Sequence, residues 1–349
     1  MESIYYVMAW ACHRRCRHCY EDRFRPYVRA DLERVIAEAE RNGPRIVANL
    51  PDRHIWLDRT GPEPVERGGR IILAGGESLL DGVRERVTYP TMERLAARYR
   101  GQGVKVVVQT TGDLLTPAII RDLVDRGAWT ISVAGVDDFH VGLEGPERQA
   151  AFKARLTSMF EAEGLSLAGR NAHERRAWFE EEGPLFSFFG ATPDQWIGKL
   201  WPRGRAWING LSTATLADNF CARWSGGMNF LRAGEAGSEV SVEPDGAVYP
   251  CCLKTAAPLG YLTEEPLDAI LASLRDDPAF QAIDQGDPAR MGLTDGWTEA
   301  EFLARCETTT PQGRAYANLC IGCDSFHADV LAPRLAAARA RRLGAMAPC

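Results

Sequence analysis

The sequence lacks any uncharged apolar run close to the roughly 20 residues that a membrane span requires, so no membrane segment is expected. Its first residues, MESIYYVMAW, contain neither a basic segment nor a small-residue cleavage site, which predicts a cytoplasmic protein without an export signal. A net charge of -6 supplies no broad basic field, so nucleic acid is not an expected partner. Internal repeats and low-complexity tracts are absent too.

What the sequence does have is cysteine, ten residues in all. Cytoplasmic thiols stay reduced, so cysteines in such a protein more often bind metals or carry out redox chemistry than form disulfides. The spacing of the cysteines is therefore the main indicator of function.

Short apolar runs alternate with segments of helical periodicity through the first two thirds of the chain, which is typical of parallel strands joined by crossover helices. The expected strands are 4–10, 70–74, 104–109, 129–133, 184–189 and 205–208. The expected helices are 28–42, ended by Gly43, then 90–101, 116–127 and 147–163. The predicted fold class is α/β, with a partial (β/α)6 TIM-like barrel over residues 1–211 and a smaller cysteine-rich domain after it.

Two stretches interrupt this alternation. Residues 45–69 exceed the usual connection of about 2 to 6 residues, and either a surface insertion or a lid would explain them, with Trp56 indicating that part of the stretch packs. Residues 168–183 are charged and helix-like, which favours a solvated face. From residue 212 the alternation stops, so a second domain is expected at 212–330 and a terminal helix or tail at 331–349.

Cys12, Cys16 and Cys19 occur as CHRRCRHCY, directly after the first expected strand. A loop can direct three thiolates at one centre, and thiolates are the natural ligands of iron-sulfur clusters. Three ligands leave one iron of a four-iron cluster free to bind a cofactor or a substrate. The alternative is a zinc site in which His13 or His18 is the fourth ligand.

This CxxxCxxC spacing, followed by an aromatic residue, resembles the radical S-adenosylmethionine (radical SAM) superfamily. The resemblance implies that Cys12, Cys16 and Cys19 hold a 4Fe-4S cluster whose open iron binds the amino and carboxylate groups of S-adenosylmethionine. The residues that it implies for cofactor binding are Tyr20 near adenine, Gly75, Gly76 and Glu77 at the methionine amino group, and Thr110 and Ser132 at the ribose and carboxylate.

Two further groups of polar residues follow later strands. An acidic group with a histidine after the fourth strand, here Asp137, Asp138 and His140 in VDDFH, is similar to the family, and His140 is either a catalytic residue or a hydrogen-bonded structural one. Arg203 and Arg205 in WPRGRAW either grip a carboxylate or phosphate or lie on the surface.

A second cysteine group follows residue 212. Residues 243–251 predict a tight hairpin that turns at Asp-Gly and delivers Cys251 at its end, while Cys320 and Cys323 form a CxxC and Cys221 precedes the hairpin. This arrangement resembles the auxiliary-cluster domains of the radical SAM superfamily called SPASM and Twitch. Because the seven-cysteine SPASM pattern stops at Cys323, the resemblance implies one auxiliary 4Fe-4S cluster held by Cys221, Cys251, Cys320 and Cys323.

Three cysteines remain outside these sets. Cys252 and Cys306 are each a substitute ligand, a hydrogen-atom donor to a substrate radical, or a plain buried thiol, and the last is the default. Cys349 is expected to be free. A structural zinc site is the alternative for the whole group, since CxxC with two further cysteines also fits tetrahedral zinc.

The resemblance implies an oxidoreductase that cleaves S-adenosylmethionine reductively to a 5'-deoxyadenosyl radical, which abstracts hydrogen from a peptide or a small molecule. Peptide maturation and dehydrogenation are both typical of the family, and a reductase such as flavodoxin or ferredoxin would supply the electron. Because the chain begins at the first barrel strand, we expect a small molecule or a peptide delivered by a separate recognition protein. The non-enzyme alternative is a zinc-binding, cysteine-rich structural or metal-storage protein.

Overall fold

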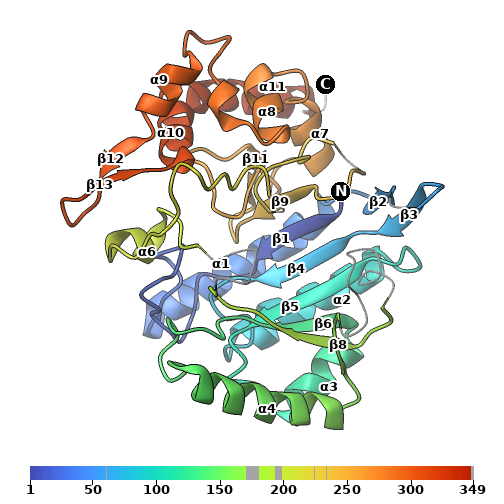
Figure 1. Ribbon diagram of the computed structural model, residues 1–349. Coiled ribbons are helices and arrows are strands. Elements are labelled where there is room, and N and C mark those ends of the chain that lie inside the picture. The colour runs from blue at the N-terminus through green and yellow to red at the C-terminus, as the bar shows by residue number, and fades with distance from the viewer. Residues whose placement is uncertain (60, 170–180, 193–198, 224, 233, 347–349) are drawn as a thin grey trace.

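The computed structural model describes residues 1–349 except 60, 170–180, 193–198, 224, 233 and 347–349 (Figure 1). The strands are β1 (Ser3–Val7), β2 (Ile55–Asp58), β3 (Val65–Gly68), β4 (Arg70–Ala74), β5 (Lys105–Thr110), β6 (Ala128–Val133), β7 (Ser166–Leu167), β8 (Leu185–Phe188), β9 (Glu239–Val242), β10 (Ala247–Tyr249), β11 (Gly260–Tyr261), β12 (Glu307–Thr309) and β13 (Ala315–Ala317). The α-helices are α1 (Arg29–Ala48), α2 (Tyr89–Arg98), α3 (Pro117–Asp125), α4 (Pro146–Ala162), α6 (Gly204–Ile208), α7 (Leu267–Ala272), α8 (Pro278–Asp284), α9 (Glu299–Ala304), α10 (Leu319–Phe326) and α11 (Ala332–Met346). Short π or 3-10 turns occur at η1 (Arg84–Thr88), η2 (Pro288–Arg290) and η3 (His327–Leu331).

One twisted sheet organises the molecule, in the order β11-β10-β9-β1-β4-β5-β6-β8-β7. Its strands from β9 to β7 pair in parallel, and its two ends do not pair with each other, so the barrel is partial. The register places Tyr5, Ile72, Val107 and Thr130 side by side on one face. The predicted α/β class with a partial barrel is confirmed.

The two faces of this sheet have different roles. On one face Ile4, Ile71 and Ile131 pack into a large apolar core with residues of helices α1 to α4, such as Ile120 and Phe160. The other face carries the side chains that line the cavity described below. Both faces of the central strands are therefore buried, as parallel sheets require, since their crossover helices cover one face and the site closes the other.

Two expected elements differ from the structure. Residues 205–208 form the short helix α6 and not a sixth barrel strand, because the side chain of Arg205 turns inward to bind backbone carbonyls of a neighbouring loop. Helix α1 continues past Gly43 and Pro44 to Ala48 because Ile46 and Val47 extend its buried face. The predicted helix at 147–163 and the predicted terminal helix are confirmed as α4 and α11.

The stretch 45–69 is partly ordered as the hairpin β2–β3 after the end of α1, and Trp56 is buried in it. The stretch 168–183 falls largely on residues 170–180, which lie outside the described residues. No helix in the described part of the chain is long and apolar enough to cross a bilayer.

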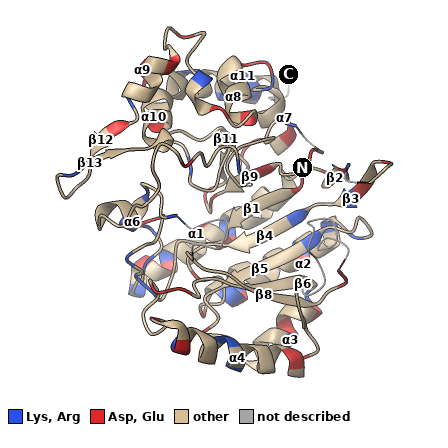
Figure 2. Ribbon diagram, in the orientation of Figure 1, with Lys and Arg blue, Asp and Glu red and all other residues tan. Residues whose placement is uncertain are grey.

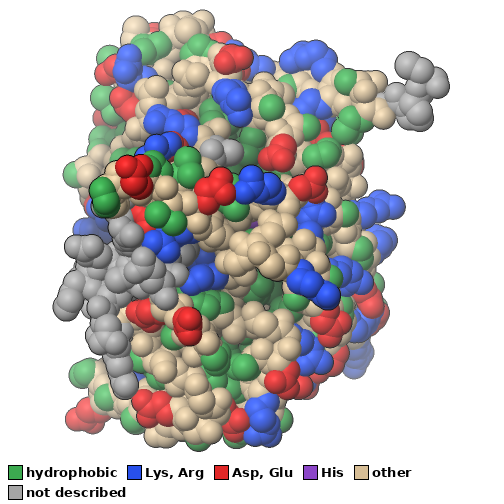
Figure 3. All heavy atoms as spheres, turned by 90° about the vertical axis from the view of Figure 1, so that its right-hand side faces the viewer, with side chains coloured by type: hydrophobic (Ala, Val, Ile, Leu, Met, Phe, Trp, Pro, Cys, Tyr) green, Lys and Arg blue, Asp and Glu red, His purple; other side chains and the backbone are tan. Residues whose placement is uncertain are grey.

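The C-terminal part joins the same sheet. Strand β9 pairs in parallel with β1, and the predicted hairpin is confirmed as β9–β10, with Gly246 at a φ of 89° in its turn. The later helices α7 to α11 gather beyond this edge of the sheet (Figure 1). Lys and Arg are interspersed with Asp and Glu in both parts of the chain (Figure 2) and on the face seen in Figure 3.

An aromatic contact joins helix α4 to strand β8, and a substitution tests its contribution to stability. Phe160 is fully buried and stacks on Phe186 with ring centroids 4.7 Å apart. We expect Phe160→Ala to lower the free energy of unfolding by about 3 to 5 kcal/mol, because it removes this contact and leaves a cavity. Urea unfolding followed by circular dichroism measures the loss. Val141→Ala, at a side chain that is 78% exposed, is the control, and equal stability of the two variants would contradict the assignment.

Candidate functional site

A cavity of about 370 Å³ opens at the carboxyl ends of the barrel strands. The three cysteines of the CxxxCxxC loop, Cys12, Cys16 and Cys19, lie in its wall. Of the residues that the sequence predicts for cofactor binding, Tyr20, Gly75, Gly76, Thr110 and Ser132 line the same cavity. The fold thus brings residues from four strand ends to one place, although they are far apart in the sequence.

The turn after β4 lies directly against the cysteine loop. The amide of Gly76 donates to the carbonyl of Ala9 at 3.2 Å, and that of Glu77 donates to Ala11 at 2.9 Å. A Cβ at position 76 would lie 2.2 Å from the carbonyl oxygen of Ala11, and Gly75 has a φ of 141°. Only glycines permit this approach, which leaves backbone groups of the turn at the cavity beside the cysteines.

Glu77 behaves differently from the other predicted residues. It is buried and is not among the residues that line the cavity. Its carboxylate accepts hydrogen bonds from the hydroxyls of Thr110 and Thr111, from the amide of Thr111 and from the amide of Leu79, at 2.7 to 2.9 Å. A carboxylate has about four acceptor positions, so these bonds occupy it and tie the β4 turn to the end of β5.

His140 lies at the opposite side of the cysteine loop. Its Nδ1 is 2.9 Å from Oδ1 of Asp137, and Asp137 in turn accepts from the amide of Ala191 at 2.9 Å. Burial lowers the pKa of His140, but the hydrogen bonds to Asp137 and to Cys16 outweigh it and raise that pKa to about 9. The imidazole is therefore a cation held against Cys16 within the cavity wall.

Ser132 and Tyr20 are each held by a second hydroxyl. The Oγ atoms of Ser132 and Ser187 lie 2.8 Å apart on neighbouring strands, and the hydroxyls of Tyr20 and Tyr5 are 3.3 Å apart. These pairs fix the orientation of both side chains, because each hydroxyl offers both a donor and an acceptor.

Four thiols form a separate group in the C-terminal part. Cys323 interacts electrostatically with Cys221, Cys251 and Cys320, so all four predicted auxiliary ligands converge. Burial, followed by the neighbouring thiols, raises the pKa of Cys221 and of Cys323 well above the ordinary value. Free thiols that converge in this way fit an iron-sulfur cluster, since a bound cluster displaces the protons and balances the charge. They do not form a compact group for a single zinc ion, because no three cysteines in the described part of the chain have all their sulfurs within 4.8 Å of one another.

The remaining cysteines are placed apart from one another. Cys252 lines the cavity with Tyr5 and Tyr20, and burial followed by the carboxylate of Glu239 raises its pKa well above the ordinary value, so the thiol is neutral. Cys306 is fully buried and its Sγ donates to the carbonyl of Phe302 at 3.3 Å. All nine cysteines in the described part of the chain are free, and Cys349 lies outside it.

Arg203 and Arg205 hold the two cysteine groups. Arg205 donates to the carbonyls of Cys16, Asp22 and Phe24 at 2.7 to 2.9 Å, which fixes the CxxxCxxC loop. Arg203 donates to the carbonyls of Leu253 and Lys254 at 3.0 and 3.3 Å, which fixes the loop after Cys251. The expected exposed position is therefore wrong for both arginines, because Arg205 is buried and the side chain of Arg203 is only 13% exposed.

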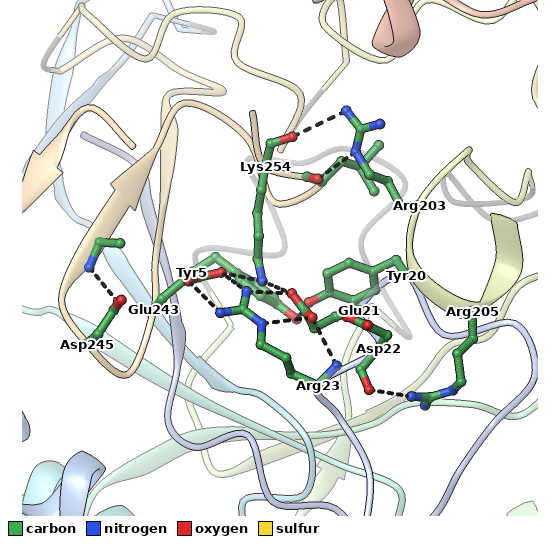
Figure 4. A network of polar contacts seen from close by, with 12 residues as sticks. Tyr5, Tyr20, Glu21, Asp22, Arg23, Arg203, Arg205, Glu243, Asp245 and Lys254 are labelled. Carbon is green, nitrogen blue, oxygen red and sulfur yellow. Dashed lines mark hydrogen bonds and ion pairs between the residues drawn. The ribbon is translucent and has the colours of Figure 1, made fainter. Parts of the chain in front are cut away.

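A ring of four charges joins these two loops (Figure 4), with both carboxylates buried, the Lys254 side chain 11% exposed and that of Arg23 42% exposed. The Lys254 ammonium is 2.6 Å from Glu21 and also pairs with Glu243, while Arg23 pairs with Glu21 at 2.7 Å and with Glu243 at 2.8 Å. Burial raises the pKa of Glu21, but its bonds with Arg23 and Lys254 outweigh this and lower it far below the ordinary value. Glu21 follows the cysteine loop and Lys254 follows Cys251, so the ring links the two cysteine groups directly.

Sequence analysis missed this ring, because it is assembled from three segments that are distant along the chain. Only a local indication was present in the sequence, since Glu21 and Arg23 directly follow CxxxCxxCY. Charged residues in such a run usually lie on a solvent-exposed surface. The ring forms because β9 pairs with β1, which brings the buried Glu243 to this loop.

Comparison with known families gives one match. Residues 235–324 match SPASM, described as an iron-sulfur cluster-binding domain. The matched range contains Cys251, Cys320 and Cys323 and leaves Cys221 outside. A comparison with curated proteins found no match.

Several solved structures resemble the fold at low sequence identity. BtrN in complex with AdoMet and 2-DOIA is 14% identical over 82% of this chain and 88% of its own, with a TM-score of 0.43. Native anSMEcpe with bound AdoMet is 14% identical over 97% and 98%, with a TM-score of 0.43. Streptococcus suis SuiB bound to precursor peptide SuiA is 11% identical over 81% and 66%, with a TM-score of 0.38. All three TM-scores are too low for these likenesses to support an inference about function.

The close approach at Gly76 generates a first test of the site. We expect Gly76→Ala to destabilise the protein by about 1 to 3 kcal/mol, because the new Cβ collides with the Ala11 carbonyl and displaces the cysteine loop. Urea unfolding and the iron content after anaerobic reconstitution measure the two effects. Gly344→Ala in α11, where a Cβ meets open space, is the matched control. An unchanged iron content and stability in Gly76→Ala would show that the loop does not need this contact.

The ring of charges generates a second test. We expect Lys254→Met to lower the free energy of unfolding by about 3 kcal/mol at pH 7, because it leaves two buried carboxylates with one cation. The folded-state pKa of Glu21 lies below its unfolded value, so its contribution is present above about pH 4.3 and is lost as the pH falls towards the folded pKa. The difference in the free energy of unfolding between wild type and Lys254→Met should therefore become smaller below about pH 4.

Urea unfolding at pH 7 and at pH 3.5 measures this difference, and the exposed Lys153→Met in α4 is the control. A loss that stays the same at both pH values would mean that Lys254 stabilises the fold by packing and not by charge.

Proposed function

We propose that this chain, a radical SAM protein with a C-terminal SPASM domain, cleaves S-adenosylmethionine reductively and uses the 5'-deoxyadenosyl radical to abstract hydrogen from a peptide or a small molecule. One observation carries this proposal. The CxxxCxxC loop and the Gly75-Gly76 turn line a single cavity at the carboxyl ends of β1 and β4, with Thr110 and Ser132 beside them.

The cysteines fit the clusters that this function needs. Three thiols at one cavity fit a 4Fe-4S cluster with one iron open to S-adenosylmethionine, while the four converging thiols Cys221, Cys251, Cys320 and Cys323 fit a fully ligated auxiliary 4Fe-4S cluster. A cluster held by Cys12, Cys16 and Cys19 would supply one electron to the sulfonium of S-adenosylmethionine, so that a carbon–sulfur bond breaks to give methionine and the 5'-deoxyadenosyl radical.

The chain's own residues bind and orient the reactants. We assign the backbone of Gly75 and Gly76 to the methionine end of the cofactor, and the oriented hydroxyls of Tyr20, Thr110 and Ser132 to its adenine, ribose and carboxylate ends. Glu77 acts as a positioning residue here, because its carboxylate holds Thr110 and is already occupied. Such residues supply orientation and exclude water, and the chemistry belongs to the cofactor.

The substrate would enter between the two cysteine groups. The cavity wall on the auxiliary side is apolar, with Trp201, Phe220 and Leu253, and the neutral thiol of Cys252 lies in it as a candidate hydrogen-atom donor. His140 is assigned to orient Cys16. A peptide, delivered by a recognition protein, and a small molecule remain equal candidates, and a flavodoxin or ferredoxin type of reductase is the proposed electron donor. Residues 1–211 and 212–330 would then hold one cluster each.

Product analysis of the reconstituted protein tests this function. We expect iron and sulfide for two clusters after anaerobic reconstitution, and 5'-deoxyadenosine after reduction in the presence of S-adenosylmethionine. Replacing Cys12, Cys16 and Cys19 together by Ala should reduce 5'-deoxyadenosine to the background of the protein without iron, because no cluster remains at the cavity. Cys320→Ala should keep some cleavage that is uncoupled from the substrate, because the cavity cysteines are intact. Liquid chromatography with mass spectrometry measures the product.

Cys349→Ala is the matched control for loss of a thiol, and it should behave as the wild type. Zinc without iron, together with no cleavage of the cofactor, would support the zinc-binding structural or storage protein instead. Cleavage that survives in the triple variant would refute the assignment of the cavity cysteines.

A further inference from the structure

Two buried hydrogen-bond donors near the auxiliary thiols have no partner in the described part of the chain. Trp201 is 7% exposed, and its Nε1 makes no hydrogen bond. His327 is fully buried, and neither of its ring nitrogens has a partner. A buried donor left without an acceptor destabilises a protein by about 1 to 3 kcal/mol. Two such donors near one site therefore indicate that a bound group supplies the acceptors when the protein is active.

Trp201 packs with two of the four thiols, and His327 lies one helical turn from a third. Trp201 packs in one cluster with Cys320, and Cys251 packs against that cluster. His327 follows Cys323 by one helical turn along α10, so the two side chains share a helix face. Burial lowers the pKa of His327 to about 3, so the ring is neutral and carries one N–H donor.

A largely buried cation, Arg203, also lies close to these thiols. The side chain of Arg203 is 13% exposed, and it donates to Asp324 at 3.0 Å and to the carbonyl of Cys320 at 3.5 Å. These contacts place its guanidinium beside the CxxC of α10. Two N–H donors and one cation therefore lie close to a site that collects negative charge when its sulfurs bind iron.

We propose that Trp201 and His327 donate hydrogen bonds to the sulfurs of the auxiliary cluster and, together with Arg203, raise its reduction potential. This inference rests on the four-thiol cluster of the proposed function. Donors and cations beside cluster sulfurs stabilise the reduced form, because reduction adds one negative charge to the cluster. Trp201 and His327 are thus positioning residues that adjust how readily the auxiliary site accepts an electron.

The potential of the auxiliary cluster tests this proposal. The full chain with Cys12, Cys16 and Cys19 replaced by Ala, reconstituted anaerobically, isolates that cluster, and its midpoint is followed by electron paramagnetic resonance. We expect Trp201→Phe and His327→Phe each to lower the equilibrium constant for reduction about tenfold, which is about 59 mV for one electron. Trp207→Phe, whose indole packs on Tyr316 instead, is the matched control and should leave the midpoint unchanged. His327→Gln keeps an N–H donor and should restore most of the loss.

A second measurement does not depend on a variant of either donor. With 15N in the indole and imidazole rings, pulsed electron paramagnetic resonance of the reduced auxiliary cluster should show 15N couplings, and Trp201→Phe should remove the indole coupling. Unchanged midpoints in both Phe variants, or no coupling to either ring, would overturn the proposal. The proposed function is judged separately, by 5'-deoxyadenosine in the protein with all its cysteines. If that product forms while the midpoints do not move, only the hydrogen-bonding role fails; if the midpoints move without product, only the proposed function fails.

Discussion

The ring of Glu21, Arg23, Glu243 and Lys254 is the constraint on which the site depends. It contains two positive and two negative charges, and each carboxylate is paired with both cations, so the cost of removing these groups from water is offset within the ring. Trp10 lies beneath both cations, with Arg23 at 3.6 Å from its ring centroid. Because the ring joins the cavity loop to the loop after Cys251, it fixes the distance between the two cysteine groups.

Arg203 and Arg205 supply hydrogen-bond donors to backbone carbonyls in both cysteine loops. A loop that points several thiols at one centre cannot also form a helix or a strand, so its carbonyls lack regular hydrogen-bond partners. A guanidinium offers five donors in a fixed plane and can satisfy several such carbonyls at once. The two arginines serve one loop each, and they lie together at the start of α6, where Arg203 is the N-cap and Arg205 is in the first turn.

Local patterns account for what the sequence could predict. Helix α4, the β9–β10 hairpin and the four central barrel strands follow from periodicity and turn residues that lie within one segment each. The failed strand at 205–208 has the same apolar appearance, but its conformation is set by the distant carbonyls that Arg205 binds. The sequence could not predict that hydrogen bonds within the protein already occupy the Glu77 carboxylate, because these bonds depend on how closely the ends of β4 and β5 approach. Residue types predicted the chemistry of the site, and tertiary contacts decided which atoms remain available for it.

Adjacent cysteines mark the boundary between the two halves of the site. Cys251 joins the four-thiol group, whereas Cys252, the next residue, lies in the cavity wall. The turn that follows is sharp, since Lys254 has a φ of 65° and its amide donates back to the carbonyl of Cys251 at 3.1 Å. Arg203 donates to the backbone carbonyl of this strained residue, and the carboxylates of the charge ring bind its ammonium group. A group bound against Cys252 would therefore lie one peptide away from the auxiliary ligand Cys251, and the same residues that fix the loop also fix that separation.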